Sequence, residues 1–156
     1  MFLGLSAAIF ILLADQLSKY FVYDFVLRDV PKIEVTSFFN IIEAWNTGVS
    51  FSMFDGNGLM GVIALSLLSG AIVMFLLIWL KGEKSRSVQL ALGFIIGGAI
   101  GNVVDRVRLR AVFDFFDFYV GKYHWPTFNV ADMFICIGAT IIVIHSMLYK
   151  KERKKI

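Results

Sequence analysis

The chain has 156 residues, of which 58% are hydrophobic and 17% carry a charge, and its formal net charge is +3. Soluble domains carry roughly 25% charged residues, so this composition excludes a water-soluble globule and indicates one domain, residues 1–156, partly surrounded by lipid. The basic residues lie in short segments between apolar runs, a pattern typical of membrane topology and not of a nucleic-acid-binding protein.

Four apolar runs each come close to the roughly 20 residues that a helix needs to cross a bilayer. They cover residues 2–22, 59–80, 88–104 and 133–149. The first run lacks the basic start and the A-x-A-like site of a cleaved signal peptide, so we expect it to be retained. The sequence therefore predicts an all-α membrane protein, a bundle of four transmembrane helices.

Two segments between these runs are more than simple loops. Residues 32–36 and 38–42 have the composition of short strands, and residues 55–58 carry a turn signal. Residues 106–129 are dense in Phe, Tyr and Trp, which suits the membrane interface. We expect a small extracytoplasmic β-strand segment and a short aromatic-rich interfacial segment.

The placement of Lys and Arg predicts how the chain is oriented. With the N-terminus inside, the cytoplasmic segments hold eight basic residues and the outer segments hold six. The side with more Lys and Arg is the cytoplasmic one. We therefore expect both termini in the cytoplasm.

Polar residues at the predicted spans gather at one depth. At about 1.5 Å per residue, Asp15 lies roughly 20 Å along the first helix, toward the outer face. The third helix runs outward and the fourth inward, so the other polar residues reach a similar level: Lys19, Asn102, Asp105, Arg106, Asp114, Asn129 and Asp132. A charge at the bilayer centre costs about 2.5–3.5 kcal/mol on insertion scales, so these residues need partners and indicate a site near the outer leaflet.

Several of these residues also have a structural interpretation. Asp15 and Lys19 can pair at i,i+4 on one helix face, and Lys19 can extend toward the headgroups. Asp105 and Arg106 could anchor a helix end at the headgroups. A stripe of glycines at four-residue spacing predicts close helix packing; its members are Gly93, Gly97 and Gly101.

Several kinds of chemistry lack the residues that they need. The single cysteine, Cys136, allows no internal disulfide. The histidines His124 and His145 have no partner at metal-ligand spacing, and the HExxH motif is absent. We therefore expect no metal and no cofactor.

Carboxylates remain as candidates for catalysis. Asp114 and Asp132 can meet if the third and fourth helices are antiparallel. Two close carboxylates can divide the work, one ionised as a base for water and the other protonated as an acid. Spacing alone leaves Asp117 an equal candidate to Asp114.

Five short blocks carry a family resemblance. They are D-Q-L-S-K at 15–19, N-T-G-V-S-F at 46–51, G-G-A-I-G-N-V-V-D-R at 97–106, V-F-D-F at 112–115 and F-N-V-A-D at 128–132. The blocks cover nearly the whole chain. In content and order they resemble the motifs of the lipoprotein signal peptidase (signal peptidase II) family.

The resemblance implies an intramembrane aspartyl endopeptidase of the bacterial cytoplasmic membrane. Such an enzyme removes signal peptides from diacylglyceryl-modified prolipoproteins, cleaving before the modified cysteine of the lipobox. It implies Asp114 and Asp132 as the catalytic pair. Residues matching substrate-binding or supporting positions are Asn46, Gly48, Asn102, Arg106 and Asn129; those matching structural support are Asp15, Lys19 and Asp105. The implied partners are prolipoproteins and membrane lipids, and we expect a monomer.

One position departs from the family pattern. The family usually has Gly four residues before the first catalytic aspartate, where this chain has Arg110. This difference concerns the local backbone of the loop and not the chemistry of the site.

Two other classes of function compete with the peptidase. A small transporter or channel subunit could use Asp15, Asp105 and Asp132 as a proton or cation path, but it would need polar residues along the full membrane depth. The cytoplasmic halves of the predicted helices are nearly all apolar. A scaffold gives no reason for paired aspartates at one depth.

Overall fold

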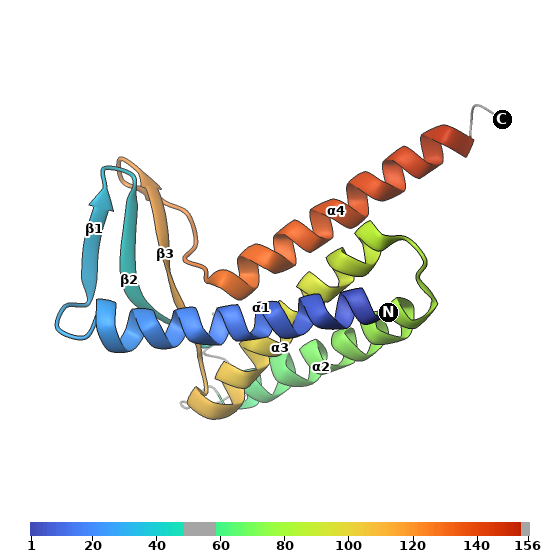
Figure 1. The fold of residues 1–156 in the computed structure, drawn as a ribbon. Coiled ribbons are helices and arrows are strands. Elements are labelled where there is room, and N and C mark those ends of the chain that lie inside the picture. The colour runs from blue at the N-terminus through green and yellow to red at the C-terminus, as the bar shows by residue number, and fades with distance from the viewer. Residues whose placement is uncertain (49–58, 154–156) are drawn as a thin grey trace.

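The computed structural model describes residues 1–48 and 59–153. The turn expected at 55–58 and the end of the block at 46–51 lie outside these described residues. Within them, long helices and a small sheet form two distinct parts of the molecule (Figure 1).

Four helices form the bundle. They are α1 (Phe2–Phe21), which continues as a short π-helix η1 (Val22–Val26), α2 (Leu59–Gly82), α3 (Arg86–Leu109) and α4 (Val130–Arg153). All four are long and apolar enough to cross a membrane, as the sequence predicts. Helices α3 and α4 extend beyond the apolar runs 88–104 and 133–149, because hydropathy ends at Asp105 and Asp132 whereas both residues lie inside helices.

Helix α3 is the central element of the bundle. It packs against α1, α2 and α4. Half of the residues in its most apolar stretch are buried, against 11% in α2 and in α4. Close contact with α1 depends on small residues: a Cβ at Gly93 or Gly97 would collide with the α1 backbone at Gly4 or Ala8. The predicted packing role of the glycine stripe is therefore confirmed.

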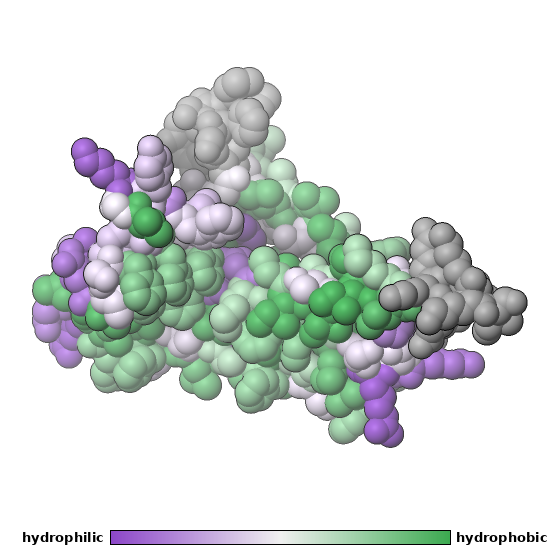
Figure 2. Space-filling view, turned by 90° about the horizontal axis from the view of Figure 1, so that it is seen from above, coloured by the Kyte–Doolittle hydropathy of each residue, from purple (hydrophilic) through white to green (hydrophobic). Residues whose placement is uncertain are grey.

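The outer surfaces of the helices are strongly apolar. Figure 2 shows hydrophobic residues along the body of the molecule and hydrophilic ones mainly toward its two ends. Large side chains such as Leu67 and Ile78 on α2, and Met147 on α4, are 67–70% exposed in the isolated chain. These surfaces suit contact with lipid.

A four-stranded antiparallel sheet stands at the end of the bundle where α1 ends and α4 begins (Figure 1). Its strands, in spatial order, are β1 (Lys32–Thr36), β2 (Phe39–Asn46), β3 (Val112–Val120) and β4 (Tyr123–His124). The strands expected near residues 32–42 are confirmed.

The aromatic-rich segment 106–129, whose conformation the sequence left open, supplies β3 and β4. The aromatic side chains of β3 explain why a strand forms there. Phe113 and Phe115 are almost completely buried and pack in one cluster with Val22 and Leu27. Aromatic residues favour strands whose side chains can pack in this way. The packing of β3 places the neighbouring Asp114 beside the ends of the helices.

Candidate active site

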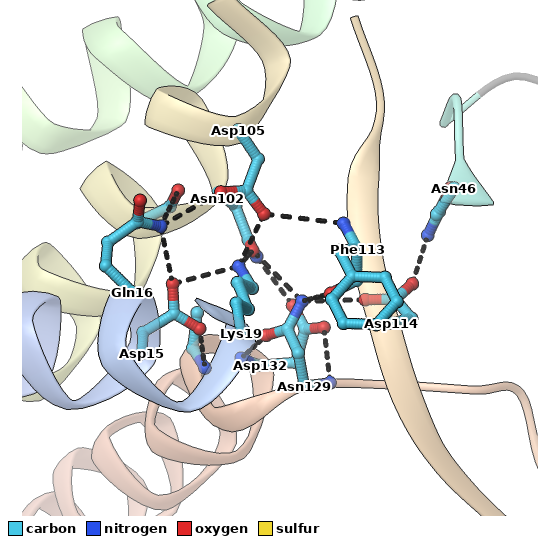
Figure 3. A network of polar contacts seen from close by, with 12 residues as sticks. Asp15, Gln16, Lys19, Asn46, Asn102, Asp105, Phe113, Asp114, Asn129 and Asp132 are labelled. Atoms are coloured by element: carbon cyan, nitrogen blue, oxygen red, sulfur yellow. Dashed lines mark hydrogen bonds and ion pairs between the residues drawn. The ribbon is translucent and has the colours of Figure 1, made fainter. Parts of the chain in front are cut away.

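Two carboxylates and three asparagines meet where the sheet joins the bundle (Figure 3). They come from four parts of the fold: Asn46 ends β2, Asn102 lies on α3, Asp114 lies on β3, and Asn129 and Asp132 lie at the start of α4. The structure thus brings together five of the residues that the sequence singles out.

Asp114 is held by two side-chain amides. Its Oδ1 accepts a hydrogen bond from Asn129 Nδ2 at 2.6 Å, and its Oδ2 accepts one from Asn46 Nδ2 at 3.0 Å. The residue is only 1% exposed. Asp114 is therefore a buried carboxyl whose two oxygens both have a fixed direction.

Asp132 is held in the same manner but is only half-buried. Its Oδ1 accepts from Asn102 Nδ2 at 2.8 Å, and its Oδ2 accepts from the backbone N–H of Asn129 at 3.3 Å. In return, the N–H of Asp132 donates to Asn129 Oδ1 at 3.0 Å. This reciprocal pair resembles the capping box of a helix N-terminus, so the F-N-V-A-D block both begins α4 and orients Asp132.

Asn129 connects the two carboxylates. It is completely buried, and its Nδ2 reaches Asp114 while its backbone and Oδ1 bind Asp132. Neutral amides orient the carboxylates without adding a full charge. Burial raises the pKa of the Asp114 carboxyl to about 6, and the nearby charge of Asp132 acts in the same direction. Asp114 therefore keeps its proton to a higher pH than an ordinary aspartate does, which suits a carboxyl that donates a proton.

A buried ion cluster lies beside this pair. Lys19 Nζ is 2.9 Å from Asp15 Oδ2 and 2.8 Å from Asp105 Oδ2, and it donates to Asn102 Oδ1 at 3.1 Å. The predicted pairing of Asp15 with Lys19 is confirmed. The alternative in which Lys19 extends toward the headgroups is wrong, because Lys19 is 6% exposed and its acceptors lie inside the protein. Asp105, 4% exposed, is likewise no headgroup anchor.

Asp15 also joins α1 to α4. Its Oδ1 accepts the backbone N–H of Ala131 at 3.0 Å, in the first turn of α4. Gly101 makes room for this carboxylate, since a Cβ there would lie 2.5 Å from Asp15 Oδ2. Gln16, which the sequence interpretation missed, donates to Asp105 Oδ1 at 2.9 Å. Its position inside the D-Q-L-S-K block at 15–19 could have indicated this role.

Arg106 and Gly48 lie at the margin of the site. Arg106 lines a pocket of about 260 Å³ between α2 and α3, together with Arg110 and apolar residues of α2. Its Nε is buried and has no hydrogen-bond partner among the described residues. The N–H of Gly48 donates to Asn46 Oδ1 at 2.8 Å, so Gly48 helps to fix the amide that binds Asp114.

Asp117 has different partners. Its Oδ2 accepts from Asn40 Nδ2 at 2.8 Å, and its Oδ1 lies 2.7 Å from His124 Nδ1. Asp132 and Asn129 are not among its hydrogen-bond partners in the described part of the chain. The structure therefore places Asp114, and not Asp117, next to Asp132, although spacing in the sequence left both open.

The residue that departs from the family pattern adopts an unusual backbone conformation. Arg110 follows the last residue of α3 as its C-cap, with φ 60° and ψ 13°, in the left-handed region that favours glycine. The fold thus keeps the helix end that a glycine would favour, but with an arginine. In the described part of the chain, no group of three or more His, Cys, Asp or Glu side chains is placed to hold a metal ion.

Comparisons with known proteins agree with this architecture. A family model described as signal peptidase (SPase) II matches residues 7–148. The lipoprotein signal peptidase of Rhodopseudomonas palustris (strain TIE-1) is 38% identical over 151 residues, which are 94% of this chain and 92% of the relative. That of Aeromonas hydrophila is 40% identical, covering 98% of this chain and 90% of the relative.

A solved structure of a bacterial membrane enzyme also superposes well. It has a TM-score of 0.77 at 27% identity, covering 97% of this chain and 90% of that one. The competing interpretation as a transporter or channel subunit is therefore set aside. The chain belongs to the signal peptidase II family and is a membrane protease of the kind that removes signal peptides from prolipoproteins.

Proposed function

We propose that this protein cleaves diacylglyceryl-modified prolipoproteins before the modified cysteine, with Asp114 and Asp132 as its catalytic pair. The observation that carries the assignment is the bridge through Asn129. One buried carboxyl and one half-buried carboxyl share this asparagine, and all four of their oxygens accept an N–H. Such an arrangement fixes two carboxyl groups for work on a single peptide bond.

The environments of the two aspartates support different roles. The raised pKa of Asp114 favours its protonated form, so this carboxyl donates a hydrogen bond to the carbonyl oxygen of the scissile peptide. Asp132 is more accessible and, when ionised, takes a proton from the attacking water. The water oxygen bonds to the carbonyl carbon to form a tetrahedral intermediate. Its collapse breaks the C–N bond, and the departing nitrogen receives a proton from a carboxyl group.

The surroundings support a route for the substrate. The pocket lined by Arg106 lies between α2 and α3 and has mostly apolar walls. Arg106 carries a buried N–H without a partner in the described part of the chain, and such a donor suits a carbonyl oxygen of an extended peptide. We assign Asn46, Gly48, Asn102, Arg106 and Asn129 to substrate binding or to support of the pair.

The membrane placement follows from the same elements. The sheet, the end of α3 and the start of α4 lie together at one end of the bundle (Figure 1). The excess of Lys and Arg on the other side supports cytoplasmic termini in the bacterial inner membrane. The sheet is then extracytoplasmic and the catalytic pair lies near the outer leaflet, where the lipid-anchored cysteine of a prolipoprotein resides. The enzyme acts as a single domain and a monomer.

Purified protein and one lipobox peptide test this proposal. The peptide is offered with and without the diacylglyceryl group, and both forms keep the same signal-sequence helix as an anchor. The lipid-modified form should be cleaved much faster, because each acyl CH₂ adds about 0.8 kcal/mol to membrane residence and the two chains hold the bond at the depth of the pair. Equal rates would show that the lipid is not recognised, and absence of cleavage would contradict the function.

A further inference from the structure

Lys19 has one more acceptor than its ion pairs require. An ammonium carries three N–H donors, and three acceptors lie within hydrogen-bond distance: Asp15, Asp105 and Asn102. The two carboxylates already compensate its charge. The third contact, at 3.1 Å to Asn102 Oδ1, leads out of the ion cluster and toward the catalytic pair (Figure 3).

This third contact determines which way the Asn102 amide points. An ammonium only donates, so Asn102 must turn its oxygen toward Lys19, and its Nδ2 is then directed to Asp132 at 2.8 Å. Asn129 Nδ2 donates to the same Asn102 oxygen at 3.2 Å. In the flipped amide, N–H groups would face N–H groups and an oxygen would face the Asp132 carboxylate. Lys19 therefore opposes the orientation that would repel Asp132.

The charge of Lys19 also reaches the pair. Burial raises the pKa of Asp114, and the positive charge of Lys19 acts against that rise. The ion cluster and the pair together hold four carboxyl groups: Asp15 on α1, Asp105 on α3, Asp114 on β3 and Asp132 on α4. Removing the ammonium would leave only carboxyl groups in this set, and the pKa of Asp114 would rise further.

We propose that Lys19 is a positioning residue for the catalytic pair, because its ammonium fixes the Asn102 amide in the orientation that holds Asp132 and places a positive charge beside both carboxylates. Lys19 acts through Asn102 and through space, and the catalytic residues remain Asp114 and Asp132. The inference rests on the proposed function, since it requires that these two aspartates perform the reaction.

Four variants of Lys19 and its partner separate positioning from charge balance. Lys19→Met removes the donors and the charge, Lys19→Gln keeps an N–H donor without charge, and Lys19→Arg keeps both. Asp105→Asn is the matched control, because it removes a charge from the same cluster but leaves the contact between Lys19 and Asn102. The kcat, the KM and the pH-rate profile are measured on the lipid-modified lipobox peptide, with thermal unfolding in detergent.

Lys19→Met should lower kcat by about 10- to 100-fold, since a small misplacement of a reacting group has effects of this size. Its KM should change little, and its pH optimum should move to higher pH, because loss of a positive charge raises the pKa values of nearby carboxyl groups. Lys19→Gln should keep more of kcat than Lys19→Met but show the same direction of pH shift. Lys19→Arg should recover most of the wild-type rate.

A double variant decides between positioning and a purely structural ion pair. Lys19→Met/Asp105→Asn has the same net charge as the wild-type cluster but lacks the donor to Asn102. Positioning predicts that its kcat stays low, whereas a structural ion pair predicts that it recovers. Recovery in a folded double variant, or unshifted pH optima in both Lys19→Met and Lys19→Gln, would overturn the inference. If Lys19→Met does not fold, Lys19→Gln and the double variant supply the same comparison.

Failure of the proposed function is recognised separately. In that case the wild-type protein does not cleave the lipid-modified peptide, or both Asp114→Asn and Asp132→Asn retain full turnover. Loss of activity in both aspartate variants, together with wild-type behaviour of every Lys19 variant, would refute the positioning role alone.

Discussion

Asp114 and Asp117 lie three residues apart on β3, and both are almost completely buried, at 1% and 3% exposure. Their chemistry nevertheless differs. Asp114 receives two neutral amides and faces a second carboxylate, and burial raises its pKa to about 6. Burial acts to raise the pKa of Asp117 as well, but hydrogen bonds from His124 and Asn40 outweigh it, and its pKa is lowered. The kind of partner, and not burial alone, decides which carboxyl is suited to hold a proton.

Activity should show the largest difference between the two aspartates. Asp114→Asn removes a titratable carboxyl that we propose takes part in catalysis, and loss of one member of a catalytic unit typically costs several orders of magnitude in kcat. Asp132→Asn should be equally severe. Asp117→Asn keeps the size of a side chain whose partners are Asn40 and His124, so its rate should fall far less. An inactive Asp117→Asn beside an active Asp114→Asn would reverse the assignment.

The free energy of unfolding at pH 7 should change in opposite directions in Asp114→Asn and Asp117→Asn. A raised folded-state pKa means that the folded protein binds the Asp114 proton more tightly, so stability is lost as the pH rises from about 4 through about 6. Asp114→Asn removes this loss, which is about 3 kcal/mol for a rise from 3.8 to about 6. One N–H of the new amide then faces the Nδ2 of Asn46 or Asn129, so the net stabilisation at pH 7 should be about 1 kcal/mol. The measurement is thermal unfolding in detergent at pH 5 and pH 7.

The lowered pKa of Asp117 makes this carboxyl stabilise the folded protein at neutral pH, the opposite of Asp114. Its stabilising contribution is present above the unfolded-state pKa and is lost as the pH falls through the lower folded-state pKa. Asp117→Asn should therefore destabilise the protein at pH 7, by about 1–2 kcal/mol for a lost hydrogen bond to a charged group. If both variants shift stability in the same direction at pH 7, the two carboxyl groups do not differ as described.

A smaller effect is expected at the helix end that leads into β3. Arg110 has φ 60°, and a residue with a Cβ in this conformation loses roughly 1 kcal/mol relative to glycine. Arg110→Gly should raise the free energy of unfolding by up to about 1 kcal/mol. Leu109→Gly is the matched control, because Leu109 is the last residue of α3 and glycine within a helix is unfavourable by about 1 kcal/mol. Equal effects of the two substitutions would contradict the strain at Arg110.

The sequence predicted the helices better than their ends. Apolar runs reveal a membrane span because lipid contact demands them, but the runs stop where charges begin. Asp105 and Asp132 are helical because Lys19 and Asn102 satisfy them from other elements. No local pattern shows such partners. The strand β3 was missed for a related reason: its aromatic residues suit both an interface and a sheet, and only packing against Val22 distinguishes the two.

The sequence identified the residues of the candidate site but not the contacts between them. The sequence blocks bring Asp114 and Asp132 to attention, but spacing could not separate Asp114 from Asp117. The separation depends on which residue of β3 faces Asn129, and this follows from the pairing of β3 with β2, where Asp114 lies opposite Ala44 and Asp117 opposite Asn40. Strand register is set by long-range contacts, which a single sequence does not display.

The contact between Asp15 and the backbone of Ala131 joins residues 116 positions apart. During translation, Asp15 enters the membrane early, whereas the N–H that it binds is synthesised near the end. The carboxylate of Asp15 therefore lacks the Ala131 N–H until the last span has been made and has packed against the first. Asn129 and Asp132 arrive with the same late span. A ribosome-bound chain that lacks this span carries only one of the two aspartates that we propose as catalytic, so on this assignment the new protein is inactive until its final helix docks.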